Sequence, residues 1–313
     1  MFSLPALKCV RDSFPKAFIA SVVRPSLRDL LASTGLVDEV MVRPTGLSVG
    51  KLALAWRLRS PGFDLALVFS QSASSALFAC LSRAHKRVGF LNASCGRLLN
   101  QHVDFRHPPS TANNLRLVKA AGCDVTVVDY AGLMKPSESD CARAEQLLSA
   151  CGIGPEDRVA ALAPGTSGRR SVKEWTDEGF AAVGRHLVRQ GVKVVVVGSF
   201  PASSIVQQYG EILDLSGKTS LAEAAAVLKR CEALVSVDSG ILHVCAAVGT
   251  KVVGLYGPSN PRITGPQGEG HVVLTSHAEC SPCMRTECKY DRECMTNLDV
   301  SAVIEAVDSV LTR

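Results

Sequence analysis

The segment SVDSGILHVC contains residue types that suit an anionic ligand. Asp238 and Ser239 are good N-cap residues, and Gly240 has no side chain to keep a ligand away from the backbone. His243 lies about one helical turn further on, so its ring can face the same ligand. A helix that starts here would present free N–H groups and the positive end of its dipole. The segment therefore predicts a site for an anion, above all for a phosphate.

A second segment, APGTSGRRSVKEW, has the same chemical character. Gly165, Thr166 and Ser167 offer backbone and hydroxyl donors, and Lys173 brings a positive charge two residues before Trp175. Taken with the first segment, these residues predict a pocket for a diphosphate. The sequence contains neither the GxGxxG fingerprint nor a GxxxxGK[ST] P-loop, which argues against a dehydrogenase and a kinase.

Three of these residues also have a purely structural interpretation. His243 could be a core histidine satisfied by a backbone carbonyl, and Asp238 could act only as a helix cap. Lys173 could be a solvated lysine at a helix start. Only the placement of the three residues on neighbouring strand ends favours a binding site.

The elements that must position these residues alternate between strand and helix patterns from residue 153 onward. Continuous apolar strands separated by amphipathic helices predict a parallel sheet covered on both faces. Ligands collect at the carboxyl ends of the strands of such a sheet. The expected strands are 158–163, 192–197, 233–237 and 251–256, and the expected helices are 176–190, 221–229 and 241–248.

The first half is a less regular α/β pattern. Its expected strands are 18–23, 39–42, 65–69 and 87–90, and its expected helices are 5–12, 47–58 and 74–83. A helix at 139–150 and the turn CGIGPED lie between the halves, so we expect domains at 1–152 and 153–313. The last helix, 299–311, could pack on either domain.

Composition narrows the class of protein. The 313 residues are 47% hydrophobic, which gives enough apolar surface for two cores. The net charge of +5 suits an anionic ligand or membrane surface, whereas 5% aromatics and the lack of an interleaved basic run argue against nucleic-acid binding. No stretch reads as a signal peptide or a membrane span, so we expect a cytoplasmic protein.

Four of the twelve cysteines cluster late in the chain, with the spacing C-x2-C-x4-C-x5-C. The other eight are scattered among apolar or helical segments and are expected to be buried thiols. The cluster could hold a structural zinc, remain as reduced thiols, or form two disulfides in an oxidising compartment. In each case we expect it to serve the scaffold. Its members are Cys280, Cys283, Cys288 and Cys294.

The motifs together resemble glycosyltransferase family nine, the ADP-heptose:lipopolysaccharide heptosyltransferases, and within it the heptosyltransferase II-like members. The resemblance is carried by PGTS with K-x-W, by VVVVGS, by SLAEAAAVLKRCEALVSVDSGILHVCAAVGTKVVGLYGPSNP and by CSPCMRTECKYDRECM. It implies a GT-B fold, in which two Rossmann-like domains face each other across a cleft. The first domain would take the acceptor and the second the nucleotide sugar.

The resemblance also implies roles for the predicted site. Gly165 and Thr166 would lie beside the donor phosphates, with Lys173 paired to them. The VDSG residues would hold the diphosphate and the sugar, and His243 would contact sugar or phosphate. The reaction would be an inverting displacement in which Lys173 and the helix N-terminus stabilise the leaving ADP, with no catalytic metal and no required cofactor.

The start of the chain departs from the family pattern. Family members begin with an apolar strand and a Gly-Asp loop, whose Asp is the proposed general base, whereas residues 1–5 already correspond to the helix that follows. The expected base therefore lies upstream of Met1, and no catalytic base can be assigned. We favour a truncated chain over a natural variant without the base.

The resemblance implies a transferase of the EC 2.4 class that uses ADP-heptose and the lipopolysaccharide inner core, in the cytoplasm and in peripheral contact with the inner membrane. One alternative is a nucleotide-sugar epimerase of GT-B fold. Another is a truncated, non-catalytic protein that binds a nucleotide sugar.

Overall fold

The residues of the chain sort into two compact units, which divide between Asp129 and Tyr130. The computed structural model describes residues 1–44, 49–91, 96–106, 109–166, 171–199, 205 and 212–312. The two units are described separately below.

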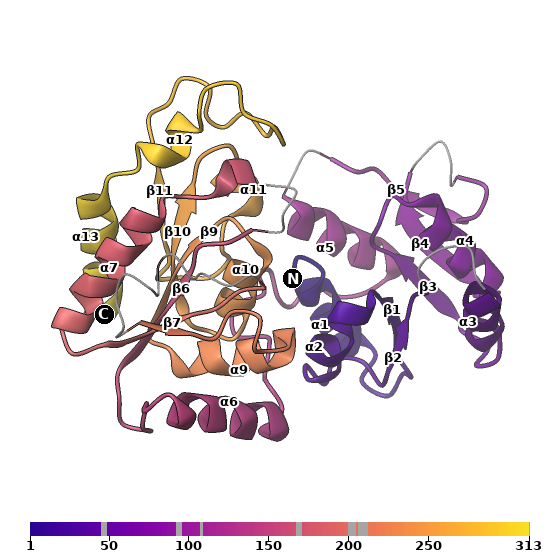
Figure 1. The fold of residues 1–313 in the computed structure, drawn as a ribbon. Helices are drawn as coiled ribbons and strands as arrows, with labels where there is room; N and C mark the ends of the chain where they lie inside the picture. Colours follow the sequence, from indigo (N-terminus) through magenta and orange to yellow (C-terminus); the bar gives the residue numbers. More distant parts are fainter. Residues whose placement is uncertain are drawn as a thin grey trace. The chain divides into compact units, whose positions relative to one another are not determined.

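The C-terminal unit is built on a six-stranded parallel sheet with the order β11-β10-β9-β6-β7-β8 (Figure 1). The central strands are buried along their whole length, as their continuous apolar sequences predict. Ala161 pairs with Leu234 of β9 and with Val195 of β7, which fixes the central register. The strands are β6 (Val159–Ala163), β7 (Lys193–Val196), β8 (Ile212–Asp214), β9 (Ala233–Val237), β10 (Lys251–Tyr256) and β11 (Val272–Thr275).

Helices cover both faces of this sheet. On one face α7 packs against α13, and on the other α10 contacts α9, which contacts α6 (Figure 1). Thr176 and Ser220 cap α7 and α9 by accepting the N3 backbone N–H. The helices are α6 (Glu138–Ala150), α7 (Asp177–Arg189), α9 (Leu221–Arg230), α10 (Gly240–Ala247), α11 (Pro261–Thr264), α12 (Glu293–Thr296) and α13 (Val300–Leu311), with the 3-10 turn η2 (Ser171–Lys173).

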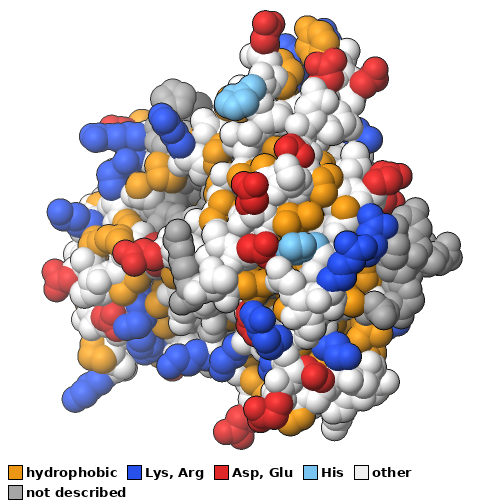
Figure 2. Space-filling model, turned by 90° about the vertical axis from the view of Figure 1, so that its left-hand side faces the viewer, with side chains coloured by type: hydrophobic (Ala, Val, Ile, Leu, Met, Phe, Trp, Pro, Cys, Tyr) orange, Lys and Arg blue, Asp and Glu red, His pale blue; other side chains and the backbone are white. Residues whose placement is uncertain are grey.

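The face of the molecule that lies on the left in Figure 1 has a mixed surface. Acidic and basic side chains are interspersed there around apolar surface (Figure 2).

The elements on this side include α7 and α13, and α13 packs onto β9, β10 and β11 as well as α7. The last helix therefore belongs to the C-terminal unit, which decides between the two placements left open by the sequence.

The predicted domain boundary at residue 152 is wrong, because the two units divide before α6 and not after it. Helix α6 packs against α9, so it belongs with the C-terminal unit. The segment before it is also bonded into that unit, because Gly132 and Met134 donate their N–H groups to the carbonyls of Ala246 and Ala247. The local helix and turn signals were correct, but they do not reveal the partner on which a helix packs.

The N-terminal unit contains two separate parallel sheets, β1-β2 and β3-β4-β5. Helix α1 packs on α5, and α3 packs on α4. The sequence predicted the strands up to β4 but missed β5, α2 and α5. The elements are β1 (Ala20–Val23), β2 (Glu39–Val42), β3 (Leu65–Val68), β4 (Lys86–Phe90), β5 (Gln101–Val103), α1 (Leu4–Ser13), η1 (Pro25–Leu27), α2 (Arg28–Ala32), α3 (Val49–Arg59), α4 (Ala73–Leu81) and α5 (Ser110–Ala121).

Among the described residues, no helix has the length and apolar character needed to cross a lipid bilayer.

Candidate functional site

The predicted site residues follow three strands that are neighbours in the sheet. Strand β9 lies between β6 and β10, and all three strands run parallel. Their carboxyl ends therefore meet at one edge, as expected for a ligand site in an open α/β sheet. The loop after β6 carries Gly165, Thr166 and Lys173, and the turn after β9 carries Asp238, Ser239 and Gly240. Ser167 lies outside the described residues.

Lys173 and Asp238 form an ion pair at this edge. The Lys173 ammonium donates to Oδ2 of Asp238, and the two residues are only 8% and 7% exposed. Thr264 of α11 lies at 3.5 Å from the same oxygen through its hydroxyl. The solvated-lysine and cap-only interpretations are therefore wrong, because the carboxylate binds the lysine and both side chains are buried.

His243 lies on the other side of the Asp238 carboxylate. Its Nε2 is 3.9 Å from Asp238 Oδ1, and its Nδ1 shares a 2.7 Å hydrogen bond with the hydroxyl of Tyr130. The two rings meet edge to face, with centroids 6.0 Å apart. Burial lowers the pKa of His243 to about 4, although the charge of Asp238 opposes the shift. The imidazole is consequently neutral near pH 7, and its Nδ1 is bonded to a side chain, that of Tyr130.

The start of α10 is open to a ligand. Ser239 is the N-cap residue by backbone geometry, with φ −142° and ψ 168°, but its side chain makes no capping hydrogen bond. Apart from its chain neighbours and the nearby backbone of its own helix, a Cβ atom added to Gly240 would have no atom of the described residues within 4 Å, and a Cβ added to Gly165 would likewise meet none beyond its chain neighbours. The first N–H groups of α10 and the backbone at Gly165 are thus approachable, as an anion site at a helix N-terminus requires.

The turn that carries Lys173 is anchored by the residues around it. Trp175 is 5% exposed, and its Nε1 donates to the carbonyl of Leu298 at 3.2 Å. Its ring packs edge to face on Phe180, with centroids 5.2 Å apart. Thr166 donates its hydroxyl to Glu174 at 3.2 Å. The K-x-W motif therefore combines a buried anchor with a lysine that reaches the site.

The cysteine-rich segment 280–294 forms hydrogen bonds to the Lys173 turn and to the residue that follows β10. Arg292 donates through Nη1 to the carbonyls of Ser171 and Glu174, at 3.3 and 3.5 Å. Ser281 donates its hydroxyl to the carbonyl of Gly257, directly after β10, at 2.5 Å. Cys294 is 4% exposed and packs so close to Gly257 that a Cβ there would lie 2.8 Å from its sulfur. The segment thus serves the scaffold of the site.

The four clustered cysteines are free thiols in the structure. Within the described ranges, which include all four, no three His, Cys, Asp or Glu side chains are arranged to hold a metal ion. The thiols lie near one another, however. Burial, followed by the neighbouring Cys280, Cys288 and Cys283, raises the pKa of Cys294 to about 11. Four cysteine thiols are suitable ligands for zinc, but in this structure they are not arranged around a metal position. Structural zinc therefore stays an untested prediction.

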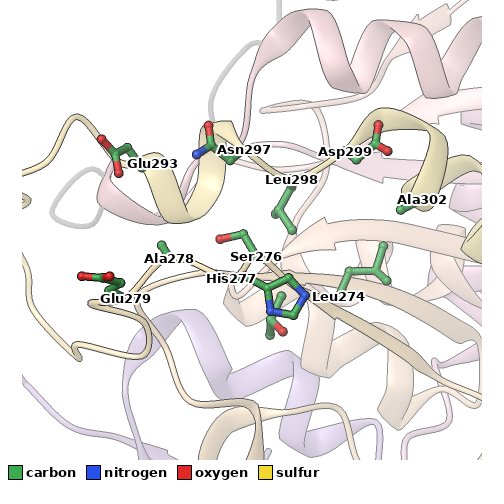
Figure 3. A pocket seen from close by; sticks show the side chains of 11 residues that line it. Leu274, Ser276, His277, Ala278, Glu279, Glu293, Asn297, Leu298, Asp299 and Ala302 are labelled. Carbon is green, nitrogen blue, oxygen red and sulfur yellow. The ribbon is translucent and has the colours of Figure 1, made fainter.

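A separate hollow of about 540 Å³ lies between the end of β11 and the start of α13 (Figure 3). Its lining includes Ser276, His277, Glu293 and Asp299, and none of the predicted diphosphate residues. It is therefore distinct from the strand-end site.

Sequence reasoning missed several residues that complete the site. Tyr130 and Thr264 lie 113 and 26 residues from the side chains they contact, and Arg292 lies 121 residues from Ser171. No spacing rule connects positions so far apart. Arg292 does belong to the cysteine-rich motif, which was the only signal that this segment had a fixed structure.

The family model described as glycosyltransferase family 9 (heptosyltransferase) matches residues 51–293. Lipopolysaccharide heptosyltransferase 2 of Salmonella typhimurium is 28% identical over 289 residues, which cover 85% of this chain and 81% of that protein. The protein of the same name from Escherichia coli is 27% identical over 289 residues, with the same coverage.

Among solved structures, the glycosyl transferase family 9 protein of Veillonella parvula has a TM-score of 0.87 at 21% identity, covering 99% of this chain and 93% of that one. Escherichia coli ADP-heptose lps heptosyltransferase II has a TM-score of 0.81 at 21% identity, covering 99% and 94%. These likenesses confirm the predicted GT-B fold class.

Proposed function

The chain belongs to glycosyltransferase family 9, and on this premise we propose that it transfers a heptose from ADP-heptose to the inner core of lipopolysaccharide. The observation that supports this best is the buried Lys173–Asp238 pair beside the open N-terminus of α10. These residues offer a cation, a carboxylate and free backbone donors at one sheet edge.

The proposed binding mode divides the donor between these groups. The diphosphate lies against the first N–H groups of α10 and the backbone of Gly165, where Gly240 and Gly165 leave space for it. Lys173 turns from Asp238 to the phosphate oxygens. The Asp238 carboxylate then accepts hydrogen bonds from sugar hydroxyls. Neutral His243 can donate a hydrogen bond to a phosphate oxygen, or form one with a hydroxyl as donor or acceptor.

The chemistry is an inverting displacement. An acceptor hydroxyl oxygen forms a bond to the anomeric carbon, the bond from that carbon to the phosphate oxygen breaks, and ADP leaves. Negative charge grows on the leaving diphosphate as the transition state becomes oxocarbenium-like. Lys173 and the α10 dipole stabilise that charge without requiring a metal or another cofactor. The acceptor's proton goes to a general base, to which we assign no residue of this chain.

The acceptor suggests where the protein works. We propose a cytoplasmic protein that contacts the inner membrane from its surface, because its proposed acceptor is anchored in a membrane. No finding favours the epimerase alternative.

Calorimetric titration with ADP-heptose, with ADP and with a UDP-sugar tests the donor site. The proposal expects binding of the first two with a clear preference over the third, and ADP release when a lipopolysaccharide core acceptor is added. Donor binding without transfer would support the non-catalytic alternative. Failure to bind ADP-heptose would overturn the proposal.

A further inference from the structure

The outer face of α3 exposes an unusual group of apolar side chains. Val49, Leu52 and Trp56 are 81%, 74% and 77% exposed. Their spacing of three and four residues places all three on one side of the helix. Arg57 and Arg59 flank this stripe and are also exposed, and Arg57 forms an ion pair with Glu39 of β2. A bulky aromatic ring and two aliphatic side chains therefore face outward together, with cations at both borders.

The same helix has a second apolar face that is already occupied. Leu54 and Leu58 are 6% and 7% exposed and pack with Met41 in one of the cores of the N-terminal unit. The outer stripe is thus not needed to attach α3 to its own unit. Exposed apolar clusters rimmed by charge typically mark interaction sites.

The neighbouring helix α4 also exposes apolar side chains. It lies beside α3 and packs against it (Figure 1). Leu77 and Leu81 on α4 are 46% and 36% exposed, and Arg83, directly after the helix, is exposed as well. We call the exposed side chains of Val49, Leu52, Trp56, Leu77 and Leu81, with Arg57, Arg59 and Arg83, the α3–α4 surface.

Charge is distributed very unevenly along the chain. Residues 49–100, which contain α3 and α4, carry seven Lys and Arg against one Asp. Residues 2–129 carry sixteen Lys and Arg against eight Asp and Glu, a formal charge of +8. Residues 130–313 carry eighteen against twenty-one, a charge of −3. The basic surplus of the protein therefore belongs to the unit that bears the α3–α4 surface.

We propose that the α3–α4 surface docks this protein onto an anionic phospholipid bilayer. Trp56, Leu52 and Val49 enter the headgroup level of the membrane, and the flanking arginines pair with lipid phosphates. Tryptophan favours this depth because its ring is both apolar and polar, and each basic residue near an anionic leaflet adds attraction. Two copies meeting through this surface would bring like charges together, which disfavours a dimer.

The inference deepens the proposed function, since a membrane-anchored acceptor makes such docking useful, but it can be tested without substrate. The chain has two tryptophans, and Trp175 is only 5% exposed. The fluorescence of Trp56 therefore reports on this surface in the unmodified protein. The probe is a set of vesicles of phosphatidylglycerol mixed with phosphatidylcholine, compared with vesicles of phosphatidylcholine alone.

We expect the anionic vesicles to shift the emission to shorter wavelength and brominated lipids to quench it, both reversed by high salt. Leu52→Glu and Arg59→Glu should each weaken vesicle binding by about tenfold. The matched control is Val128→Glu, which places the same charge at a residue of the same unit that is 69% exposed. It should bind vesicles like the unmodified protein.

Each of the following results would overturn the proposal: no vesicle binding by the unmodified protein, equal binding to neutral vesicles, vesicle binding unaffected by Leu52→Glu and Arg59→Glu, or a dimer in ultracentrifugation that Leu52→Glu dissociates. The last would make a second copy the occupant of this surface. ADP-heptose binding is measured on every variant. A surface variant that loses vesicle binding but keeps normal donor affinity contradicts neither proposal. If the unmodified protein binds the donor but does not bind vesicles, only the docking proposal is rejected.

Discussion

The carboxylate of Asp238, at the end of β9, binds the ammonium of Lys173, which lies 65 residues earlier in the chain. Both groups are buried, so each compensates the other's loss of hydration. In the proposed binding mode, a diphosphate that arrives at α10 replaces Asp238 as the partner of the lysine. The pair would then hold the cation in place until the donor binds.

Lys173→Met should abolish measurable donor binding and should also destabilise the protein by about 3 kcal/mol, because it leaves Asp238 buried and unpaired. The double variant Lys173→Met/Asp238→Asn should recover most of that stability without recovering donor affinity. Denaturant unfolding and calorimetric titration measure the two effects. Donor binding restored in the double variant would show that Lys173 serves only to neutralise Asp238.

Gly240→Ala should leave stability within about 0.5 kcal/mol of the unmodified protein, because among the described residues the added methyl group meets nothing beyond its own helix backbone and chain neighbours. It should weaken ADP binding by about tenfold, since the methyl group occupies space needed by the phosphates. Gly154→Ala is the control, because its Cβ would make only an ordinary contact of 3.6 Å with Asp157. Equal ADP affinity in both variants would place the diphosphate elsewhere.

The free energy of unfolding should fall as the pH is lowered from about 6.5 to about 4. In the folded protein the pKa of His243 is lowered from 6.5 to about 4. Between these two pH values the histidine binds a proton in the unfolded chain but not in the folded protein. The loss attributable to His243 is about 3 kcal/mol at most. The stability difference between the unmodified protein and His243→Gln, followed by denaturant unfolding against pH, should show this slope. A difference that is independent of pH would mean that the folded imidazole titrates normally.

Arg292→Asn should weaken ADP binding by about threefold to tenfold. The substitution removes the hydrogen bonds from Arg292 to the carbonyls of Ser171 and Glu174, and these bonds hold the Lys173 turn in place. Arg292 has a positive φ of 61°, which asparagine tolerates, so backbone strain should contribute little. The control is Arg285→Asn, at an exposed position of the same segment. An unchanged ADP affinity for Arg292→Asn would show that Arg292 does not position the turn.

Alkylation should distinguish the clustered thiols. Cys288 is exposed, whereas Cys294 is 4% exposed and burial raises its pKa to about 11. Iodoacetamide at mildly alkaline pH, followed by peptide mass spectrometry, should modify Cys288 first and Cys294 only after unfolding. Rapid labelling of Cys294 in the folded protein would show that the segment does not pack on β10 as described.

The sequence by itself determined most of the longer local elements and named the candidate site residues. The predicted bounds of β9 and β10 agree with the structure, because a buried parallel strand is a continuous apolar run that needs no information from elsewhere in the chain. The same pattern did not reveal β8, which has three residues, or β11, which has four. Runs as short as these are weak signals.

Only the tertiary structure decided the partners. Asp238 fits a helix cap by local rules, yet it binds Lys173 because β6 and β9 are adjacent in the sheet and their ends meet. Tyr130 reaches His243, and α6 joins the C-terminal unit, through contacts with α10 and α9 far along the chain. Strand order and helix packing follow from burying many side chains at once, and no single segment contains that information.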